Sequence, residues 1–245
     1  MPKQRLDQLL VTRGLAPSRA RAQAIVLAGQ VFVGGARVDK AGALVAEDAD
    51  VEVRGADHAY VSRGGVKLAG ALDGFGVRVE GLVCLDLGAS TGGFTDCLLQ
   101  RGAAKVTAVD VGYGQLAHKL RVDPRVVVME RTNARTLDPA AVGGPADLTV
   151  VDASFIGLDK LMPAIARCTR SGGALVALVK PQFEVGREVA SRARGVVRDE
   201  EVRAGAIASA ADAVAAAGFA VLGRRDSTLP GPKGNVEAFV HARRL

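Results

Sequence analysis

The stretch Asp86-Leu87-Gly88-Ala89-Ser90-Thr91-Gly92-Gly93-Phe94 decides the fold of this 245-residue chain. It follows the apolar residues 82–85 and runs into a helical pattern, which is typical of a glycine-rich cofactor loop between a strand and a helix. Ser90 stands where a dinucleotide-binding loop has its second glycine, so the sequence favours a cofactor without a pyrophosphate. Taken alone, the loop would also fit a purely structural turn.

Strand-like and helical segments alternate from a helical pattern at residues 66–75 to the end of the chain. This alternation predicts an α/β fold with a mostly parallel sheet and helices on both of its faces. Seven strands that end in a late strand pair favour the Rossmann-like fold of class I methyltransferases over that of a dehydrogenase. The predicted strands are residues 83–87, 105–110, 126–130, 148–151, 174–179, 220–225 and 237–242.

The N-terminal residues predict a small α+β domain with two short helices and a sheet. Ser18 is a suitable N-cap for a second helix that runs to Leu27, and Gly29 is a suitable C-cap. Residues 31–33 and 51–53 alternate as half-buried strands. We expect one domain at residues 1–55, a linker at 56–62 and a second domain at 63–245.

The composition is that of a soluble protein, with 49% hydrophobic and 24% charged residues. The three cysteines are widely spaced, which indicates a reducing compartment, and we expect the cytoplasm. Arg13 interrupts the apolar residues 9–11, so no signal peptide is expected. The weakly polar run at 204–223 is alanine-rich and carries Asp212, which favours a packed helix over a membrane span.

The formal net charge is +6, and residues 1–40 hold seven basic residues against two acidic ones. Such concentrated positive charge attracts a polyanion and releases its counterions, which makes nucleic acid the leading partner. A solvated basic face is the alternative when the charge is considered alone.

Four polar residues stand at the ends of predicted elements. Asp152 and Lys180 directly follow predicted strands, and ligands bind at this carboxyl edge of open parallel sheets. Glu237 enters the last predicted strand, and Lys67 lies in the first turns of the helix at 66–75. Each of them alone would be interpreted as part of a surface ion pair. Together they predict one catalytic site that draws a proton from a weakly acidic group.

S-adenosylmethionine suits the loop, because its amino acid end can lie against the glycine-rich turn. Its ribose hydroxyls need an acceptor at the end of the next strand, where Asp110 stands. Asn133 is either a contact for the adenine edge or a turn residue. No histidine or carboxylate cluster has metal-ligand spacing, so no metal is expected. The predicted cofactor-binding residues are Asp86, Gly88, Ala89, Ser90, Thr91, Gly92, Phe94, Asp110, Val111, Asn133 and Asp152.

The first fifty residues resemble the small RNA-binding module known from ribosomal protein S4. The resemblance lies in the Arg-Leu-Asp start at Arg5, the Ser-Arg helix opening at Ser18 and the Gly-x-Val-x-Val-x-Gly turn at 29–35. It implies that arginines of the second helix and the residues after it meet RNA phosphates. The residues assigned to RNA in this way are Arg5, Arg19, Arg21 and Lys40.

The rest of the chain resembles the TlyA family and, by its Lys-Asp-Lys-Glu set, the wider FtsJ group of ribose methyltransferases. The matching stretches are residues 61–68, 86–95, 110–116, 130–135, 152–156, 179–184 and 230–237. The resemblance implies 2′-O-methylation of cytidine in ribosomal RNA with S-adenosylmethionine as donor. It implies catalytic roles for Lys67, Asp152, Lys180 and Glu237, and Arg63 joins the RNA contacts. We expect a monomer that binds ribosomal RNA and no membrane.

Lys180 is the expected base, since a ribose hydroxyl attacks only when its proton is drawn away. The positive charges of Lys67 and the sulfonium favour the neutral amine, whereas Asp152 and Glu237 oppose it and aim the lysine. We expect the target nucleotide to be extruded into the pocket. Residues 186–198, with four arginines, are either a lid over RNA or a surface loop.

Other functions remain open at this stage. A pseudouridine synthase would need a mainly antiparallel catalytic domain, and a metal-dependent methyltransferase would need a ligand cluster. An RNA-binding assembly factor would bind RNA without forming product. A membrane-lytic haemolysin would need an amphipathic or spanning segment. Because the chain stops soon after its last predicted strand, the resemblance favours large-subunit RNA as the substrate, with the small subunit as a further possibility.

Overall fold

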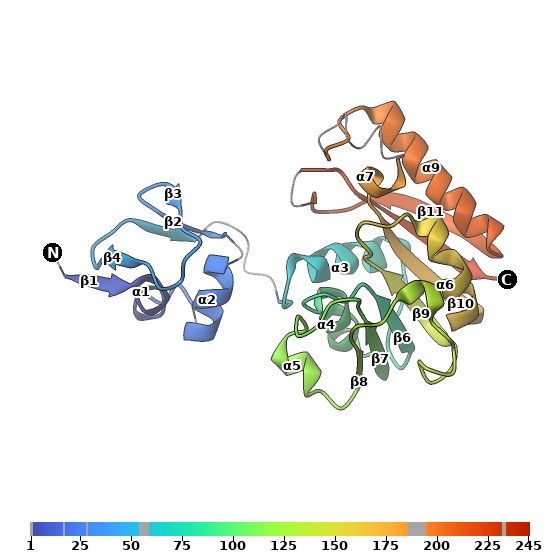
Figure 1. The fold of residues 1–245 in the computed structure, drawn as a ribbon, viewed down its shortest axis with the longest axis horizontal. Helices are drawn as coiled ribbons and strands as arrows, with labels where there is room; N and C mark the ends of the chain where they lie inside the picture. Colours follow the sequence, from blue (N-terminus) through green and yellow to red (C-terminus); the bar gives the residue numbers. More distant parts are fainter. Residues whose placement is uncertain (1, 17, 28, 54–58, 186–194, 232–233) are drawn as a thin grey trace. The chain divides into compact units, whose positions relative to one another are not determined.

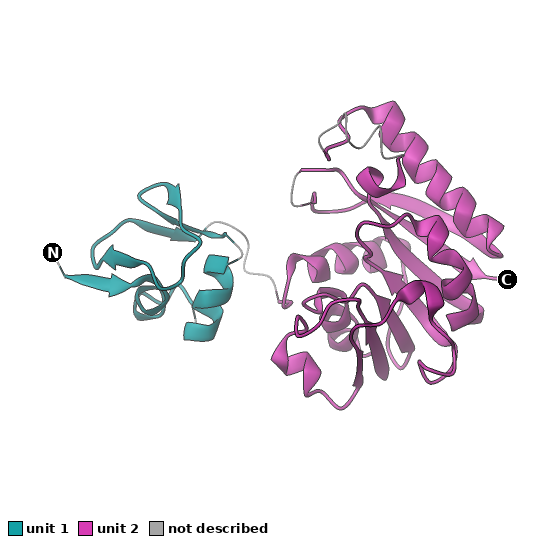
Figure 2. Ribbon diagram, in the orientation of Figure 1, with its two compact units in different colours: residues 1–57 teal, residues 58–245 magenta. Residues whose placement is uncertain are grey.

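The computed structural model describes the chain except for residues 1, 17, 28, 54–58, 186–194 and 232–233. The chain divides into two compact units, residues 1–57 and residues 58–245, coloured separately in Figure 2. The linker expected at residues 56–62 is described only from residue 59. The residues that follow are tied to the second unit, because Asp96 accepts a hydrogen bond from the Val61 amide at 2.8 Å.

The first unit packs two helices, α1 (Leu6–Thr12) and α2 (Arg19–Leu27), against short strands. Its buried core includes Leu6, Leu10, Val26 and Val31. The expected pairing of residues 31–33 with 51–53 is present as β2 with β5. The strands are β1 (Lys3–Arg5), β2 (Val31–Val33), β3 (Ala36–Arg37), β4 (Leu44–Ala46) and β5 (Val51–Val53), in the sheets β1-β4 and β3-β2-β5.

Local signals account for the second helix of this unit. Ser18 Oγ accepts a hydrogen bond from the Arg21 amide at 3.2 Å, as an N-cap does. Gly29 has a φ of +69°, the left-handed conformation that ends helices and that glycine adopts without strain. Both cap predictions therefore agree with the structure.

The second unit is built on a seven-stranded sheet in the order β11-β12-β10-β9-β6-β7-β8 (Figure 1). The five strands from β8 to β10 are parallel neighbours, and β12 pairs antiparallel with both β10 and β11. The predicted Rossmann-like fold with a mostly parallel sheet is confirmed. The strands are β6 (Val83–Leu87), β7 (Lys105–Val109), β8 (Val126–Met129), β9 (Ala146–Val151), β10 (Thr169–Val179), β11 (Phe219–Asp226) and β12 (Ala238–Arg244).

Helices cover both faces of this sheet. Alternate residues of β10 face opposite ways: Ala177 packs with the core around α6 and α9, and Val176 packs with the core around α3 and α4. This alternation follows from the pleat of a strand. The helices are α3 (Arg63–Phe75), α4 (Gly93–Gln100), α5 (His118–Arg121), α6 (Met162–Cys168), α7 (Pro181–Glu184) and α9 (Glu200–Ala216), with 3-10 helices at Ala134–Thr136 (η1) and Leu158–Lys160 (η2).

The alanine-rich run at 204–223 is helical only in its first part. Helix α9 ends at Ala216, since Gly218 takes a φ of +83° and β11 begins at Phe219. Among the described residues, no helix is both long enough and apolar enough to cross a membrane. The three cysteines are free and buried.

Candidate active site

The predicted catalytic residues gather at the carboxyl edge of the sheet. Val179 is opposite Ala238 at the end of the antiparallel pair of β10 and β12. Lys180 follows Val179 and Glu237 precedes Ala238, so these two residues flank the same end of the strand pair. The sequence predicted Glu237 as the first residue of the last strand. In the structure β12 begins at Ala238, so Glu237 directly precedes the strand.

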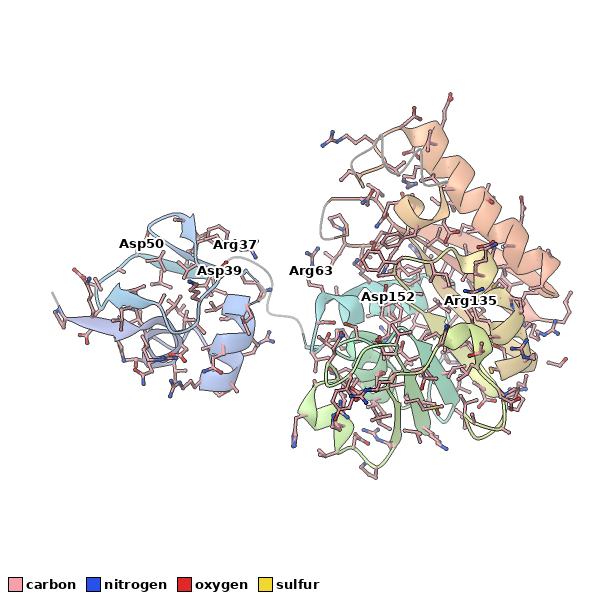
Figure 3. All side chains as sticks on the ribbon, viewed as in Figure 1. Arg37, Asp39, Asp50, Arg63, Arg135 and Asp152 are labelled. Atoms are coloured by element: carbon pink, nitrogen blue, oxygen red, sulfur yellow. The ribbon has the colours of Figure 1, made fainter. Side chains whose placement is uncertain are left out.

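Strand alternation sends these side chains to one face. Val150 and Leu178 pack in the core under α3 and α4, as does Phe239 of β12. Asp152, Lys180 and Glu237 are each two residues from one of these, and side chains two apart on a strand share a face. Figure 3 labels Asp152 beyond the end of β9. The site thus lies on the face that α3 covers.

Lys180 forms the first of two lysine–carboxylate pairs. Its Nζ lies 2.6 Å from Oδ1 of Asp152 and donates a hydrogen bond to Ser154 Oγ at 2.8 Å. The Asp152 contact is an ion pair without hydrogen-bond geometry, since Oδ1 accepts no hydrogen bond. The Lys180 side chain is 12% exposed and that of Asp152 is 26% exposed. A ligand can therefore reach this pair.

Lys67 and Glu237 form the second pair, which is more deeply buried. Lys67 Nζ donates to Oε2 of Glu237 at 2.6 Å, and the Glu237 side chain is 1% exposed. Gly231 makes room for it, because a Cβ there would lie 2.6 Å from Oε1 of Glu237. The contact joins the first turns of α3 to the residue before β12, so it also holds α3 on the sheet.

Each lysine is thus matched with one carboxylate, and this arrangement was not expected from the sequence. The prediction was that the positive charge of Lys67 lies beside Lys180 and favours its neutral form. In the structure Lys67 is paired with Glu237 instead, and Lys180 lies against Asp152 and Ser154. Once Lys180 has lost its own proton, its neutral amine can remove a proton from a bound ligand, and Asp152 orients that amine.

The cofactor loop lies beside Asp152. The amides of Gly88 and Ala89 donate to Val109 O at 2.9 and 3.1 Å, which turns the chain sharply after β6. Gly88 has a φ of +88°, and a Cβ there would lie 2.7 Å from the carbonyl oxygen of Asp152. Only glycine allows this approach of two backbones.

Asp110 organises the loop through both of its oxygens. Oδ2 accepts the Ser90 amide at 2.8 Å and Oδ1 accepts the Gly112 amide at 2.7 Å. Ser90 is held at a φ of +49°. Each carboxylate oxygen has a second lone pair, so ribose hydroxyls can still bind Asp110. Asp110, which was predicted to bind the cofactor, therefore also fixes the conformation of the loop.

Asp86 carries an unsatisfied oxygen at the end of β6. The residue is fully buried, and the Thr95 hydroxyl donates to Oδ2 at 2.6 Å, while Oδ1 has no partner among the described residues. Burial raises the pKa of Asp86 to about 7, against the effect of the Thr95 hydrogen bond. A ligand ammonium group would satisfy Oδ1. The amino acid end of S-adenosylmethionine carries such a group, so the residues present fit this cofactor.

The remaining predicted cofactor residues differ in their settings. Phe94 is buried and stacks on Phe239 with ring centroids 6.1 Å apart, so it packs in the core. Asn133 Oδ1 accepts a hydrogen bond from the Arg135 amide at 3.0 Å and caps η1. This is the role of a turn residue, one of the two roles predicted for Asn133. Val111 is 72% exposed. Around the loop, Ala89 and Gly92 are buried, and Ser90 and Thr91 are exposed.

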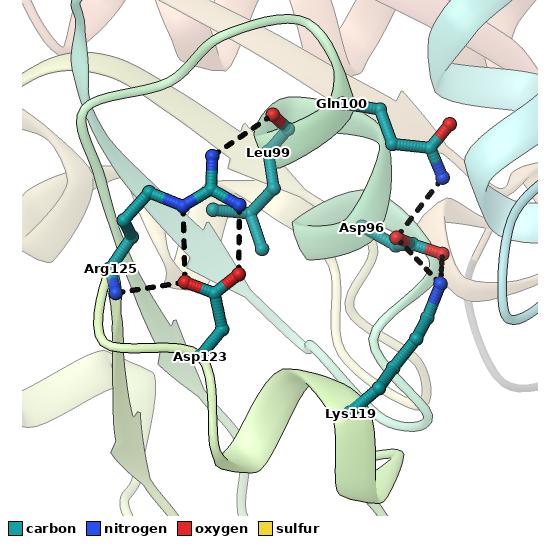
Figure 4. Close-up of polar contacts among 6 residues, drawn as sticks. All are labelled: Asp96, Leu99, Gln100, Lys119, Asp123 and Arg125. Carbon is teal, nitrogen blue, oxygen red and sulfur yellow. Dashed lines mark hydrogen bonds and ion pairs between the residues drawn. The ribbon is translucent and has the colours of Figure 1, made fainter.

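A polar network supports α4 behind the loop (Figure 4). Asp96 lies in the first turn of α4 and accepts hydrogen bonds from Lys119 and Gln100, each at 3.1 Å. Arg125 binds Asp123 through Nε and NH2 and reaches Leu99 O at 3.4 Å. These contacts fix the helix whose N-terminus follows the loop.

Two of the predicted RNA-binding arginines share one buried carboxylate. Asp7 is fully buried and accepts hydrogen bonds at 3.0 Å from Arg5 and Arg19, and at 2.9 Å from Gln23. The Arg5 guanidinium in particular holds the pKa of Asp7 well below its usual range. The side chains of Arg5 and Arg19 nevertheless remain 42% and 52% exposed.

The other predicted RNA contacts are spread over both units. Lys40 is exposed, and the Arg21 amide takes part in the helix cap. Arg63 begins α3 in the second unit and donates to Pro230 O at 3.0 Å, which ties α3 to the loop before Glu237 (Figure 3). The lid considered at residues 186–198 lies mostly outside the described residues. Val197, which is described, is buried and held by Asn235 Oδ1 at 2.9 Å.

Several residues of the site were missed by sequence reasoning. Ser154 binds Lys180, and the neighbouring Phe155 is 90% exposed with a φ of +65°. Asn235 and Glu184 anchor loops at the edge of the site. All four stand within a few residues of a predicted catalytic residue. All four residues lie in the stretches that match the TlyA family, which could have drawn attention to them. The residues that they contact in the fold cannot be identified from the sequence.

A shallow hollow of about 630 Å³ lies at the opposite edge of the sheet, around Phe75, Arg170 and His241. None of the predicted site residues lines it. Its position at the end of α3 places it away from Lys67, which is in the first turns of that helix. The chemistry of the chain is therefore not expected there.

Comparison with known proteins agrees with this geometry. Residues 60–244 match the FtsJ-like methyltransferase family, and residues 4–51 match the S4 domain. The sheet, the loop and the two lysine–carboxylate pairs thus belong to a methyltransferase, joined to an S4 domain.

Individual relatives narrow the assignment. The chain is 49% identical, over 98% of its length and 89% of the relative, to the 16S/23S rRNA (cytidine-2′-O)-methyltransferase TlyA of Mycobacterium tuberculosis. It is 35% identical to the 23S rRNA (cytidine-2′-O)-methyltransferase TlyA of Campylobacter jejuni, over 74% of this chain and 70% of that one. A solved structure described as a hemolysin from Streptococcus thermophilus is 41% identical, with a TM-score of 0.78, covering 100% of this chain and 89% of that one. The chain therefore belongs to the TlyA family of FtsJ-like methyltransferases, as the resemblance predicted.

Proposed function

We propose that this enzyme methylates the 2′ oxygen of a cytidine ribose in ribosomal RNA, with S-adenosylmethionine as the methyl donor. The observation that carries the proposal is the pair formed by Lys180 and Asp152, which lies beside the cofactor loop at the carboxyl edge of the sheet. Ribosomal RNA is the substrate named for two relatives, which match 98% and 74% of the chain.

The donor supplies an electrophilic methyl group, and the protein supplies placement and a base. In the proposed reaction Lys180 takes the proton of the ribose hydroxyl, and Asp152 and Ser154 hold its amine in line. Lys67 is held by Glu237, which flanks the same end of the β10 and β12 pair as Lys180, so we assign Lys67 to the ordering of the site. Asp86 and Asp110 would hold the amino acid and ribose ends of the donor.

Phe155 supports an extruded target nucleotide. A bulky residue with positive φ and an almost fully exposed ring is costly, so it indicates a functional surface. Its ring lies 5.1 Å from that of Phe183, next to Lys180. An aromatic face in this place would stack on a base that has left the RNA helix.

Large-subunit RNA is the proposed substrate, with the small subunit as a second one. The names of both TlyA relatives include 23S rRNA, and of these two names that of the M. tuberculosis protein also includes 16S rRNA. Separated ribosomal subunits, incubated with the enzyme and labelled donor, would distinguish the two. The methylated sugar would be located as the linkage that resists alkali.

The test of the chemistry is Lys180→Arg. A guanidinium keeps the positive charge but does not give up its proton, so we expect methyl transfer to fall at least about a hundredfold. Cofactor binding, measured by titration, should change little. Lys105→Arg at the start of β7, at the opposite edge of the sheet, is the matched control and should keep its activity. Turnover of the Lys180 variant close to that of the control would remove Lys180 as the base.

A further inference from the structure

The short helix α7 links Lys180 to an acidic residue with no role in the proposed reaction so far. Lys180 is the N-cap of α7, and Glu184 is its last residue. The Glu184 carboxylate accepts a hydrogen bond from the Leu158 amide, with distances of 3.0 Å to Oε1 and 3.3 Å to Oε2. Leu158 follows the loop that begins at Asp152. Glu184 therefore connects the segment after β10 to the segment after β9.

We propose that Glu184 is a positioning residue for methyl transfer, which holds the loop 152–158 on α7 and thereby sets Asp152 and Ser154 on the amine of Lys180. The inference rests on the proposed function, because it concerns the base of that reaction. The hydrogen bonds of the Glu184 carboxylate go to the Leu158 amide. It acts through the loop that carries the partners of Lys180.

Three contacts tie the loop to α7 and its cap. Ser154 binds Lys180 at one end, the rings of Phe155 and Phe183 meet in the middle, and Glu184 binds the Leu158 amide at the other end. The loop stores strain, since Phe155 has a φ of +65°. Such a conformation persists only when its surroundings hold it. Glu184 supplies a carboxylate acceptor to this set of contacts, and hydrogen bonds to an ionised acceptor are the stronger kind.

The backbone before Leu158 packs closely against the Glu184 carboxylate. Gly157 lies against the carboxylate, because a Cβ there would be 3.3 Å from Oε2 of Glu184. Burial raises the pKa of Glu184 to about 7, the Leu158 amide opposes this, and Asp159 adds to it. Asp159 itself is paired with Lys160 at 2.8 Å on the same 3-10 helix. Above about pH 7 the residue is the anion that accepts the amide, and below it the acceptor is weaker.

The first experiment compares Glu184→Gln and Glu184→Ala in the full chain. Glu184→Ala should lower kcat about tenfold to a hundredfold, with KM for RNA and for the donor within about twofold, because only the alignment of the base is lost. Glu184→Gln keeps an amide oxygen for the Leu158 N–H, so it should retain most of kcat at pH 8. Its kcat should also lack the rise near pH 7 that Glu184 contributes in the parent enzyme.

A second experiment removes the donor of the same hydrogen bond. Leu158→Pro has no amide hydrogen, and proline is tolerated at the first position of a helix. The preceding Gly157 has φ −72° and ψ 150°, which suits a residue before proline. Leu158→Met keeps the amide and most of the buried side chain, and serves as the matched control. If both residues act through one bond, Glu184→Ala combined with Leu158→Pro should lose no more kcat than the worse single variant.

A normal kcat in folded Glu184→Ala, or a loss confined to KM, would overturn the proposal, and so would additive losses in the double variant. Melting curves show which variants are folded. If Glu184→Ala does not fold, an unchanged pH profile in Glu184→Gln would overturn the proposal equally. The proposed function fails separately, if the parent enzyme forms no alkali-resistant linkage in either subunit.

Discussion

At the scale of residues, the two lysine pairs differ in what their loss would cost. The side chains of Lys180 and Asp152 are 12% and 26% exposed, so a partner left alone by a substitution can still contact water. Lys67 and Glu237 are almost wholly buried, and removal of one partner leaves a charge without compensation. Lower activity in a Lys67 variant would therefore report stability as well as chemistry.

The buried pair gives a prediction that separates these two effects. Lys67→Met should lower the free energy of unfolding of the second unit by about 3 to 5 kcal/mol, because Glu237 stays charged and unpaired. Lys67→Met with Glu237→Leu should recover much of that loss and should still lack methyl transfer. Urea unfolding and single-turnover assays measure the two quantities. A double variant as unstable as the single one would show that the charge of Glu237 is not the cause.

At the scale of helices and strands, the sequence predicted the strands better than the contacts between distant residues. Several strands of the large sheet contain short apolar runs, such as residues 126–129 and 174–179, and such runs are visible locally. The β1 and β4 pair was not predicted, because β1 is Lys-Gln-Arg and β4 is Leu-Val-Ala, and neither alternates between polar and apolar residues. Contacts between distant residues were out of reach: Lys67 and Glu237 are 170 positions apart, and their pairing depends on how α3 lies on the sheet. The sequence therefore placed the catalytic residues at one edge without revealing which would pair.

The cofactor loop yields a prediction at this scale. In Gly88→Ala the new methyl group would meet the carbonyl of Asp152 and would sit at positive φ, so the loop must move. We expect a loss of about 2 kcal/mol or more in stability and at least tenfold weaker cofactor binding. Gly144→Ala is the matched control, since Gly144 has a φ of +105° with nothing within 4 Å of its Cβ. Equal effects of the two variants on cofactor titration would mean that the close backbone approach at Gly88 does not shape the site.

At the scale of the whole molecule, charge is divided unevenly between the units. Residues 1–57 hold eight basic and seven acidic residues, whereas residues 58–245 hold 24 and 19, so most of the excess of +6 belongs to the second unit. Five of the seven acidic residues of the first unit lie at 47–57, whereas seven of its eight basic residues lie at 3–40. RNA should therefore meet only part of the first unit. A small net charge there does not argue against RNA binding, because phosphates respond to local groups within about 10 Å.

Lys40 is the cleanest probe of that RNA contact, since it is exposed, whereas Arg5 and Arg19 also stabilise Asp7. In Lys40→Gln we expect weaker binding of ribosomal RNA, and a plot of log K against log salt whose slope is smaller by about 1, as for one lost phosphate contact. Arg78→Gln makes the same change of charge near the far end of α3, in the hollow away from the site, and should leave that slope unchanged. Because both variants lower the net charge equally, a general electrostatic attraction would reduce the two slopes alike. Different slopes would locate the RNA on the first unit, where a specific phosphate contact is expected.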